Sequence, residues 1–494
     1  MKRKRKEVAA EPNPAEWEAR SLERFKPLLN EEEFKQLVEE IRSPLPLAFR
    51  YNPLKTTRET VLGLANRYHW SLEPIPFCPT GFRVSELEGA IPVSQTLEHK
   101  MGHYYIQEAA SMLPVELFRM TAAEPELCLD LAASPGGKTT HLVSRGEDHS
   151  LVFANDSSAG RIQALRVVLQ NWGALNTAVT QFPGEKFGAW FADTFDRVLI
   201  DAPCSMQGLR TAESHDVRPV TDREISSLSR RQANLLASAF QAVKVGGEVV
   251  YSTCTLVPEE DEAVIDAVLK RFAGKVEVIQ TNMRAPGVVS AGGQEFDPEV
   301  QKSIRLWPNR FHTAGFFACL LRKTGNLDLP VASPPYRPLE RTGFSPLRAK
   351  EVRELESNLL DAYGFNLAKE LDRYRLDLVG YGSRVYAFPE RMLVEFSGLP
   401  IQSTGLLVGE QTADGFVPAH EWVSRFFNSF SANRFVVPEE WIDAWMRGEN
   451  LTGPAVSQQN AGSILVMVDS DGRYLGRGKV SGERIKNLLP HRLV

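Results

Sequence analysis

Short apolar runs alternate with helical stretches between about residues 99 and 323. The apolar runs predict five strands, at residues 127–133, 151–155, 197–201, 248–252 and 316–321. Apolar positions at helical spacing predict four helices, at residues 138–145, 157–172, 222–243 and 259–272. This alternation predicts an α/β fold of Rossmann-like type, with a mostly parallel sheet covered by helices on both faces.

Two further regions are expected to flank this domain. Residues 1–95 predict a small α+β unit, with a helical pattern over 17–41 that Pro27 divides, a strand over 47–55 and a helix over 57–68. Thr56 and Glu59 are spaced as a capping box for that last helix. Proline-rich sequence around 324–346 marks a linker, so we expect a linker and intermediate region over 326–400. Residues 401–494 predict a mostly β module, because apolar runs at 463–468 and 474–480 flank a turn.

Composition narrows the class of protein. The 494 residues suffice for two to four domains, and 24% charged and 9% aromatic residues are typical of folded chains. We find no apolar run near the ~18 residues of a membrane span, and the basic N-terminus lacks the apolar segment of a secretory signal. Five cysteines without a CxxC pair and nine histidines without a cluster favour reduced thiols, a cytoplasmic location and no bound metal.

Polar residues at the carboxyl ends of the predicted strands are the first candidates for chemistry, since ligands of such sheets bind there. Asp156 follows the second strand, Asp201 ends the third, and Cys254 follows the fourth. We therefore look for chemistry at these three strand ends.

A loop of small residues follows the first predicted strand, and it consists of Ala132, Ala133, Ser134, Pro135, Gly136, Gly137 and Lys138. Its glycines allow a ligand to approach closely, and the N-terminus of the next helix favours a negative group. A P-loop is excluded because Ala132 occupies the position of its first glycine, and the pattern GxGxxG is absent. The remaining candidate is the type of loop that binds S-adenosylmethionine. In that type an acid after the next strand, here Asp156, holds the ribose hydroxyls. A glycine turn without a ligand is the alternative.

Two cysteines are expected at neighbouring strand ends. Cys204 follows the third predicted strand and Cys254 the fourth, and adjacent parallel strands are about 4.8 Å apart. A single cysteine is usually a small buried apolar residue. Two thiols at strand ends beside a cofactor loop instead indicate chemistry.

These motifs resemble those of the RNA cytosine-5 methyltransferases of the NOL1/NOP2/Sun family. Asp-Ala-Pro-Cys204 with Ser-Thr-Cys254 resembles the paired signature of that family, and Tyr-Tyr-Ile-Gln-Glu-Ala-Ala-Ser111 its lead-in segment. The loop ending at Lys138 resembles its cofactor loop, and Arg-Leu-Trp-Pro308 with Gly-Phe-Phe317 its closing motif. The agreement covers about residues 45–325. Segments at 407–410, 416–422, 447–449, 476–479 and 486–490 are similar to the PUA-like module of the bacterial RsmF branch.

The resemblance implies roles for individual residues. Carbon 5 of cytosine is too weak a nucleophile to attack a sulfonium methyl unaided, and the resemblance implies that the Cys254 thiolate adds to carbon 6. Asp201 is expected to hydrogen-bond ring N3, Lys138 to orient Asp201 and lower the thiol pKa, and Cys204 to assist release. S-adenosylmethionine is expected to contact the seven loop residues together with Asp156, Arg161 and Asp201.

RNA is the partner that the resemblance implies, most specifically small-subunit ribosomal RNA bound by a monomer. The target base must be unstacked, so the expected substrate is a loop or a splayed strand. We expect residues 1–95 to bind RNA, 96–325 to form the methyltransferase domain and 401–494 to form a PUA-like RNA-binding module. A transfer RNA substrate, methylation of a protein or small molecule, and a non-catalytic RNA-binding assembly factor remain alternatives. The net charge of −5 is compatible with RNA because both ends are basic, at Lys2 to Lys6 and over 473–494.

Two features depart from the family pattern. Pro183 lies in a segment where the family often has an acid near the adenine, which puts that cofactor contact in question. Met206 and Gln207 replace the usual Gly-Glu after the first cysteine motif and change the rim of the substrate crevice.

Overall fold

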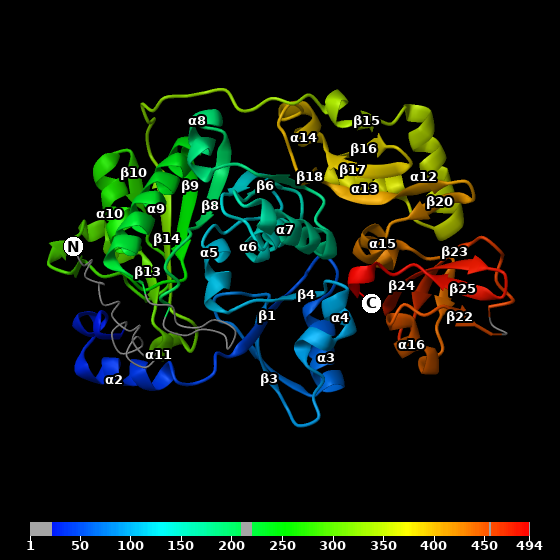
Figure 1. The fold of residues 1–494 in the computed structure, drawn as a ribbon, viewed down its shortest axis with the longest axis horizontal. Helices are drawn as coiled ribbons and strands as arrows, with labels where there is room; N and C mark the ends of the chain where they lie inside the picture. The colour runs from blue at the N-terminus through cyan, green and yellow to red at the C-terminus, as the bar shows by residue number, and fades with distance from the viewer. Residues whose placement is uncertain (1–21, 209–219, 454–455, 494) are drawn as a thin grey trace, which may run out of the picture.

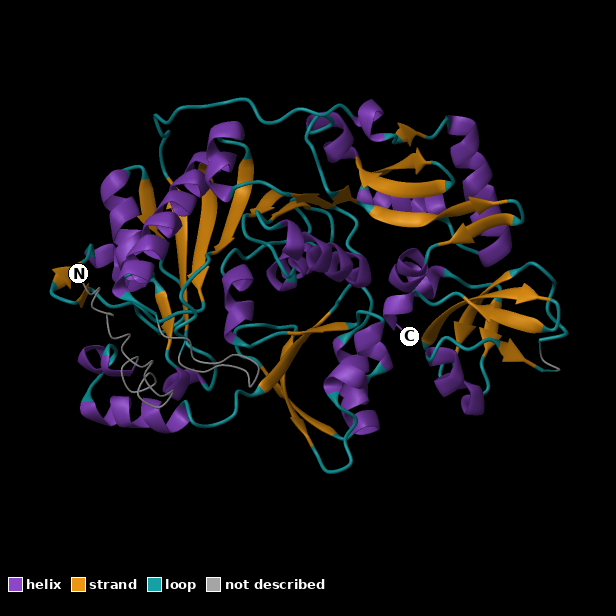
Figure 2. Cartoon of the chain, in the orientation of Figure 1, coloured by secondary structure: helices purple, strands orange, loops and turns teal. Residues whose placement is uncertain are grey.

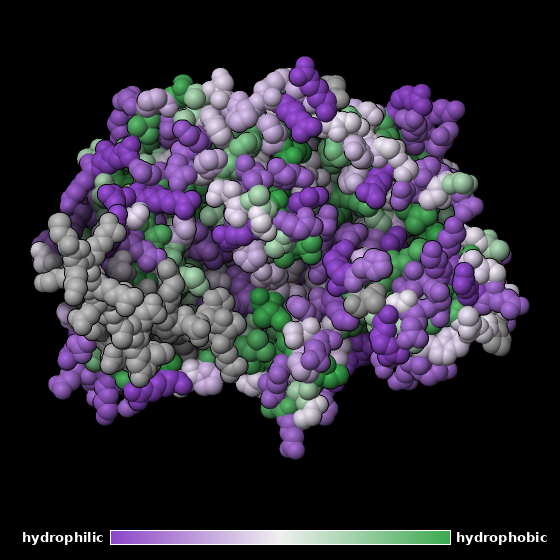
Figure 3. Space-filling model, viewed as in Figure 1, coloured by the Kyte–Doolittle hydropathy of each residue, from purple (hydrophilic) through white to green (hydrophobic). Residues whose placement is uncertain are grey.

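A computed structural model describes residues 22–208, 220–453 and 456–493. An N-terminal unit, a central α/β domain and two C-terminal regions each carry their own sheet (Figures 1 and 2). The face seen in Figure 3 is largely hydrophilic, with apolar side chains in small groups. Among the described helices, none is both long and apolar enough to cross a membrane. The basic run Lys2 to Lys6 and residues 17–21 of the predicted first helix lie outside the described residues.

The N-terminal unit is an antiparallel four-stranded sheet in the order β2-β3-β1-β4. Its elements are α2 (Glu31–Glu40), β1 (Leu47–Tyr51), α3 (Arg58–Tyr68), β2 (Trp70–Pro74), β3 (Gly81–Glu86), α4 (Leu97–Lys100) and β4 (Tyr104–Ile106). The predicted cap at Thr56 is wrong: α3 starts one residue later, so Thr57 is the cap and its hydroxyl accepts from the Thr60 amide. Strand β4 pairs with β1, and the sheet therefore extends past the boundary expected at residue 95.

The central sheet has nine strands, in the order β10-β14-β9-β8-β5-β6-β7-β18, with β13 beside β14. Its strands are β5 (Leu127–Asp130), β6 (Leu151–Asn155), β7 (Thr177–Thr180), β8 (Phe195–Asp201), β9 (Val243–Thr253), β10 (Val276–Val278), β13 (Ile304–Leu306), β14 (Phe316–Lys323) and β18 (Ser403–Thr404). Strands β7, β6, β5, β8 and β9 are parallel. The expected strand at 316–321 is present as β14 but runs antiparallel to β9. A parallel return needs a crossover of a dozen or more residues, whereas only the four-residue α11 (Pro308–Phe311) lies between β13 and β14. The sheet is therefore mixed: its five adjacent strands from β7 to β9 are parallel as predicted, and the pairs made by β14 and β18 are antiparallel.

Helices cover both faces of this sheet, as predicted (Figure 1). Leu127 and Leu129 point to one face and pack with α9 (Asp222–Ala242) and α10 (Glu262–Arg271). Cys128, between them, points to the other face and packs with α6 (Gly137–Arg145) and α7 (Ala159–Trp172). Alternate side chains along a strand thus contribute to two separate hydrophobic cores, one on each face of the sheet.

The C-terminal part contains two five-stranded sheets. The first sheet consists of strands β15 (Ser345–Pro346), β16 (Leu376–Tyr381), β17 (Arg384–Pro389), β19 (Leu406–Thr412) and β20 (Gly415–Pro418). Helices α12 (Ala349–Tyr363) and α13 (Leu367–Tyr374) belong to the same region. The second comprises α16 (Glu439–Met446) and strands β21 (Arg434–Val436), β22 (Leu451–Thr452), β23 (Ile464–Val468), β24 (Tyr474–Ser481) and β25 (Arg484–Asn487), and α15 (His420–Phe426) lies between the two sheets in sequence. Because β17 pairs with β19, the boundary expected at residue 400 falls inside the first sheet.

Candidate active site

The loop between β5 and α6 is held in a fixed shape by its own sequence. Gly136 adopts φ +118°, a conformation that side chains rarely adopt. A Cβ there would also lie 3.0 Å from Val168 and 3.1 Å from Leu165 on α7. The Ala133 amide donates to the carbonyl of Asn155 at 2.7 Å, which ties the loop to the end of β6.

Asp156 is buried directly after β6 and faces this loop. Its carboxylate accepts from the Ser134 amide at 3.3 Å and from the Ser158 amide at 2.8 Å. The guanidinium of Arg161 lies 3.6 Å from the same carboxylate and donates to the Ser134 carbonyl. A carboxylate at a strand end beside a glycine loop and a helix N-terminus is a donor and acceptor set that fits a ribose carrying a charged amino-acid group.

Lys138 and Asp201 form an ion pair at the carboxyl end of β8. Lys138 Nζ lies 2.7 Å from Asp201 Oδ2, and Asp201 Oδ1 accepts from the Ser252 hydroxyl at 3.1 Å. Burial disfavours the ammonium, but Asp201, with smaller contributions from Cys254 and Asp130, outweighs it and raises the pKa of Lys138. Lys138 therefore remains a cation beside the thiols.

The two thiols predicted to share a crevice are in contact. Asp201 and Ser252 are register partners in the parallel pair β8–β9, and Cys204 and Cys254 follow them. Their sulfur atoms are 3.2 Å apart, with Cys254 exposed and Cys204 half-buried. The hydrogen bond to Cys254, followed by burial, raises the pKa of Cys204 well above its ordinary value. Either sulfur can be the donor in this contact, and the raised pKa favours the protonated form of Cys204.

A cluster of buried charges supports both thiol loops, and sequence reasoning missed it. Glu260 Oε2 accepts from the Ser205 amide and from the Gln232 side chain, both at 2.9 Å. Asp261 accepts from the Thr253 hydroxyl at 2.6 Å. The sequence predicts only the start of a helix at the acids 259–262, although four consecutive acids before an apolar run are a signal of charge pairing.

Arg305 is the cation of this cluster. It is fully buried, pairs with Glu262 at 2.9 Å and donates to the Leu256 carbonyl at 2.7 Å. Burial opposes its charge, but Glu262 and Asp261 outweigh that effect and raise the pKa of Arg305. The arginine of the closing motif therefore fixes the segment that follows Cys254.

Arg50 of β1 is a second residue that sequence reasoning missed. It is fully buried and donates to the Gly137 carbonyl at 3.0 Å and to the Thr140 hydroxyl at 2.8 Å. Its guanidinium lies 4.8 Å from the centre of the Trp172 ring. The N-terminal unit thus holds the first turn of α6, directly after the cofactor loop.

The two departures from the family pattern lie at the edges of the site. Pro183 begins a short 3-10 turn, and the preceding Phe182 carbonyl accepts from the Asn155 side chain at 3.0 Å. Met206 is in the left-handed region at φ +59° with half of its side chain exposed, whereas Gln207 is buried. Met206 therefore occupies a backbone conformation that suits glycine.

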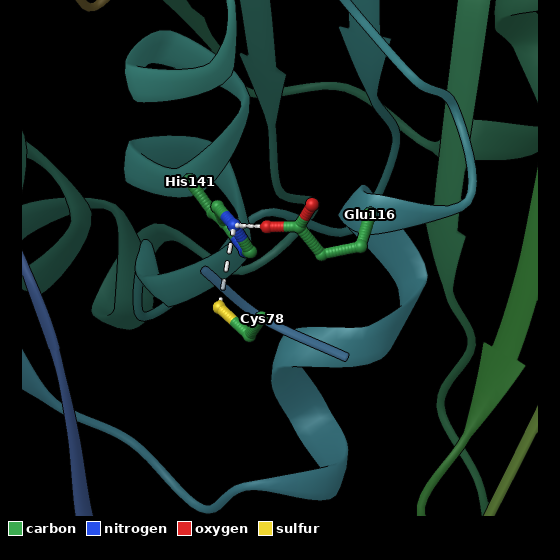
Figure 4. Close-up of side chains that lie close together, drawn as sticks. All are labelled: Cys78, Glu116 and His141. Carbon is green, nitrogen blue, oxygen red and sulfur yellow. Dashed lines mark hydrogen bonds and ion pairs between the residues drawn. The ribbon is translucent and has the colours of Figure 1, made fainter. Parts of the chain in front are cut away.

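Cys78, Glu116 and His141 form a cluster with metal-type donors that the sequence did not predict, because its members are far apart in the chain (Figure 4). His141 Nε2 lies 2.9 Å from Glu116, and Cys78 Sγ lies 4.0 Å from the same nitrogen. Burial lowers the pKa of His141 to about 4, so it is a neutral donor to Glu116. The guanidinium of Arg145 lies 3.5 Å from the same carboxylate. These hydrogen bonds account for the cluster as a link between the N-terminal unit and α6, and the absence of a metal stays a prediction.

The basic C-terminal stretch is mostly engaged within the protein. Arg473 pairs with Glu98 at 3.2 Å, and Lys479 pairs with Asp414 at 2.7 Å. Arg492 pairs with Glu421, and Arg477 donates to backbone carbonyls. Arg473 therefore links the last sheet to the N-terminal unit, and Arg477, Lys479 and Arg492 make contacts within the C-terminal regions instead of forming a free basic patch.

Comparison with protein families gives two matches along the chain. The family described as 16S rRNA methyltransferase RsmB/F matches residues 118–322. The family described as the N-terminal domain of 16S rRNA methyltransferase RsmF matches residues 19–109, which includes β4.

Individual relatives extend the similarity to nearly the whole chain. Proteins called ribosomal RNA small subunit methyltransferase F are 33% identical over 461 residues in Aeromonas hydrophila and 30% identical over 462 residues in Escherichia coli. Both alignments cover 93% of this chain and 93% of the relative. The crystal structure of a methyltransferase homolog protein from Pyrococcus horikoshii is 29% identical with a TM-score of 0.56, and covers 63% of this chain and 99% of that one.

Proposed function

This chain belongs to the ribosomal RNA small subunit methyltransferase F family, and on that premise we propose that it methylates carbon 5 of a cytosine in small-subunit ribosomal RNA. The observation that carries the proposal is the contact between two strand-end thiols, Cys204 and Cys254, beside the Lys138–Asp201 ion pair. A methyltransferase acting on an oxygen or nitrogen atom already has a nucleophile and needs neither thiol.

In this proposal Cys254 is the nucleophile. Its exposed thiolate adds to carbon 6, and the electron pair released into the ring makes carbon 5 nucleophilic. We assign to Asp201 the hydrogen bond with ring N3, and to Lys138, its ion-pair partner, the roles of orienting Asp201 and favouring the thiolate by its charge. After carbon 5 takes the methyl group, loss of the carbon-5 proton allows the bond between carbon 6 and Cys254 to break. Cys204, in contact with the Cys254 sulfur, assists this elimination.

S-adenosylmethionine supplies the methyl group when it is bound. We assign its binding to the loop Ala132 to Lys138, with Asp156 for the ribose hydroxyls and Arg161 and Asp201 as further contacts. Pro183 supplies neither a carboxylate nor an amide proton on the adenine side. The Asp156 contacts are therefore expected to contribute a large share of the affinity.

RNA contacts outside the reaction centre are assigned to the flanking regions. We propose that the N-terminal unit, extended to β4, binds RNA, and that α15 and the last sheet form the PUA-like module. The first C-terminal sheet is then an intermediate domain that includes β19 and β20. A monomeric state and a cytoplasmic location stay predictions.

A transfer assay tests the proposed function. The protein is incubated with S-adenosylmethionine labelled in its methyl group and with unmodified 16S rRNA, and the RNA is digested to nucleosides. We expect the label in 5-methylcytosine. Label in another nucleoside contradicts the proposed reaction. If only transfer RNA acquires label, transfer RNA replaces small-subunit ribosomal RNA as the substrate. Absence of binding heat for S-adenosylmethionine in calorimetry would leave only the non-catalytic assembly factor.

A further inference from the structure

A large cavity lies away from the thiols, where the N-terminal unit meets the C-terminal regions. Its volume is about 1010 Å³, at the upper end of the range of roughly 300–1,000 Å³ found for ligand pockets. Its walls come from the segment 53–67, the end of α6, α13, residues 424–429 and the turn at 471–474. None of the residues assigned to catalysis or to the cofactor lines it.

Cations outnumber acids in the lining, although the whole chain carries a net charge of −5. Four acids line the cavity, Glu98, Glu147, Glu370 and Asp471, against six basic residues, Lys55, Arg67, Arg145, Arg373, Arg425 and Arg473. Four of the arginines are held by ion pairs, Arg67 with Asp471, Arg145 with Glu116, Arg425 with Asp148 and Arg473 with Glu98, and burial lowers the pKa of Lys55 to about 7. The hydroxyls of Thr57 and Thr60, at the start of α3, add donors to the same wall. Guanidinium, ammonium and hydroxyl groups together are the donors that proteins present to phosphate oxygens.

Several buried polar atoms of the lining lack a partner within the described residues. They are Thr56 Oγ1, His103 Nδ1 and Arg425 Nε. Burial lowers the pKa of His103 to about 3, so this imidazole is neutral. These three atoms lie beneath the surface of the cavity, so they add to its polar surroundings without reaching its interior.

Arg373 is the most available cation of the lining. Its side chain is exposed at the end of α13, its guanidinium lies 5.1 Å from the centre of the Tyr374 ring, and no ion pair within the described residues engages it. Phe427, half-buried on the same wall, adds an aromatic face. Arginines beside aromatic rings are typical of surfaces that bind single-stranded RNA.

The cavity and the reaction centre share one element. Helix α6 begins at Gly137 beside the cofactor loop and ends at Arg145 in the cavity wall. Nine residues of helix are about 13 Å long. The cofactor loop and the cavity wall are therefore about 13 Å apart along this helix.

We propose that this cavity binds the phosphodiester backbone of the RNA substrate outside the target nucleotide. The inference rests on the proposed function and adds to it a second contact, which supplies affinity and position rather than chemistry. The junction of the domains then binds RNA, a role separate from the chemistry at the thiols.

Charge reversal on α13 tests the proposal with a matched control. Arg373→Glu removes a cation of the cavity, whereas Lys369→Glu makes the same charge change at an exposed position of the same helix outside the cavity. We expect Arg373→Glu to raise the KM for 16S rRNA about 5-fold or more and to lower the salt dependence of RNA binding by about one phosphate contact or more. Its kcat and its KM for S-adenosylmethionine should not change, and Lys369→Glu should resemble the wild type. Equal effects of both variants, or a fall in kcat alone, overturn the proposal.

Cross-linking locates the contact directly and separates the two proposals. Wild-type protein is irradiated with 16S rRNA that contains 4-thiouridine, and we expect cross-linked peptides from 53–67, 367–374 or 424–429. Methylation of the RNA without cross-links at the cavity overturns this inference and leaves the proposed function intact. If the wild type methylates no RNA, the proposed function itself fails. Binding of inorganic phosphate that Arg373→Glu weakens, with no change in the KM for RNA, overturns the RNA assignment.

Discussion

The two halves of the candidate active site are held in different ways. On the cofactor side, the loop after β5 is fixed by backbone amides, by the left-handed Gly136 and by one carboxylate, Asp156. On the thiol side, the segments after β8 and β9 rest on a buried cluster in which Arg305 opposes Asp261 and Glu262. The hydrogen bonds of the Ala133 amide and of the Asp156 carboxylate lie within residues 127–161, whereas the second half draws its support from α9, α10 and β13.

This difference has an energetic consequence. A carboxylate that accepts from loop amides is satisfied locally, so its replacement weakens a ligand site more than it weakens the fold. A buried ion cluster is costly when one partner is removed, because the remaining charges lose their compensation. We therefore expect substitutions of the residues that support the thiols to unfold the protein more readily than substitutions of the residues that support the cofactor loop.

The largest effect is expected at the thiols themselves. Cys254→Ala should lower methylation about 1,000-fold or more, because carbon 5 is then never activated, while RNA binding persists. Cys204→Ala should instead accumulate a covalent protein–RNA adduct, seen as a shifted band on denaturing gels. Near-normal turnover of Cys254→Ala removes it as the nucleophile, and normal release by Cys204→Ala removes its assigned role.

The next effect tests the buried cluster. Arg305→Met leaves two carboxylates buried without their cation, and we expect the free energy of unfolding to fall by about 3–5 kcal/mol. Arg322→Met is the control, because Arg322 pairs with Glu248 at 3.0 Å but is 40% exposed, and exposed pairs contribute about 0–1 kcal/mol. Denaturant unfolding of both variants gives the comparison. Equal losses contradict a special role of the cluster.

We expect substitution of Asp156 to have a smaller effect on stability but a clear effect on the binding of S-adenosylmethionine. Asp156→Asn keeps the shape and removes the charge, and loss of a charge-assisted hydrogen bond of about 1.5–3 kcal/mol raises the KM for S-adenosylmethionine about 10- to 100-fold. The control is Asp196→Asn at the opposite edge of the sheet, where Asp196 also accepts from a backbone amide, that of Leu127 at 2.8 Å. The control variant should keep the wild-type KM, and a rise in both KM values argues for a general loss of fold.

The same contrast explains which parts of the candidate site can be predicted from the sequence. The cofactor half is local, so strand, glycine loop, helix and following acid are visible in one continuous stretch, and the structure places them as expected. The contact between Cys204 and Cys254 was also predictable, because parallel pairing of β8 and β9 brings strand ends together.

The supports of the thiol half and of α6 were not predictable. Arg305 meets Glu262 across 43 residues, and Arg50 meets Thr140 across 90. No spacing rule links residues so far apart in a single sequence. The antiparallel direction of β14 and the pairing of β17 with β19 were missed for the same reason, because strand partners depend on the path of the chain and not on the local pattern.

The smallest expected effect concerns a carboxyl group behind the cofactor loop. Asp130 is fully buried at the end of β5 and accepts from the Thr139 hydroxyl at 2.7 Å. Burial, with a smaller contribution from Asp201, raises the pKa of Asp130 to about 7 against the opposing hydrogen bond. Because this pKa is higher in the folded state than in the unfolded chain, its contribution to stability is fully present below about pH 4 and is lost progressively as the pH rises from about 4 to about 7.

Asp130→Asn should remove this pH dependence, since the amide has no charge to desolvate and still accepts from Thr139. The free energy of unfolding of the variant relative to wild type is expected to rise by on the order of 1–2 kcal/mol between pH 6 and pH 8. Asp328→Asn, at a side chain that is 94% exposed, is the control and should leave the wild-type profile unchanged. Parallel profiles of wild type and Asp130→Asn from denaturant unfolding at the two pH values would show that Asp130 is ionised in the fold. The cofactor half would then also rest on a buried charge, and its contrast with the thiol half would be one of degree.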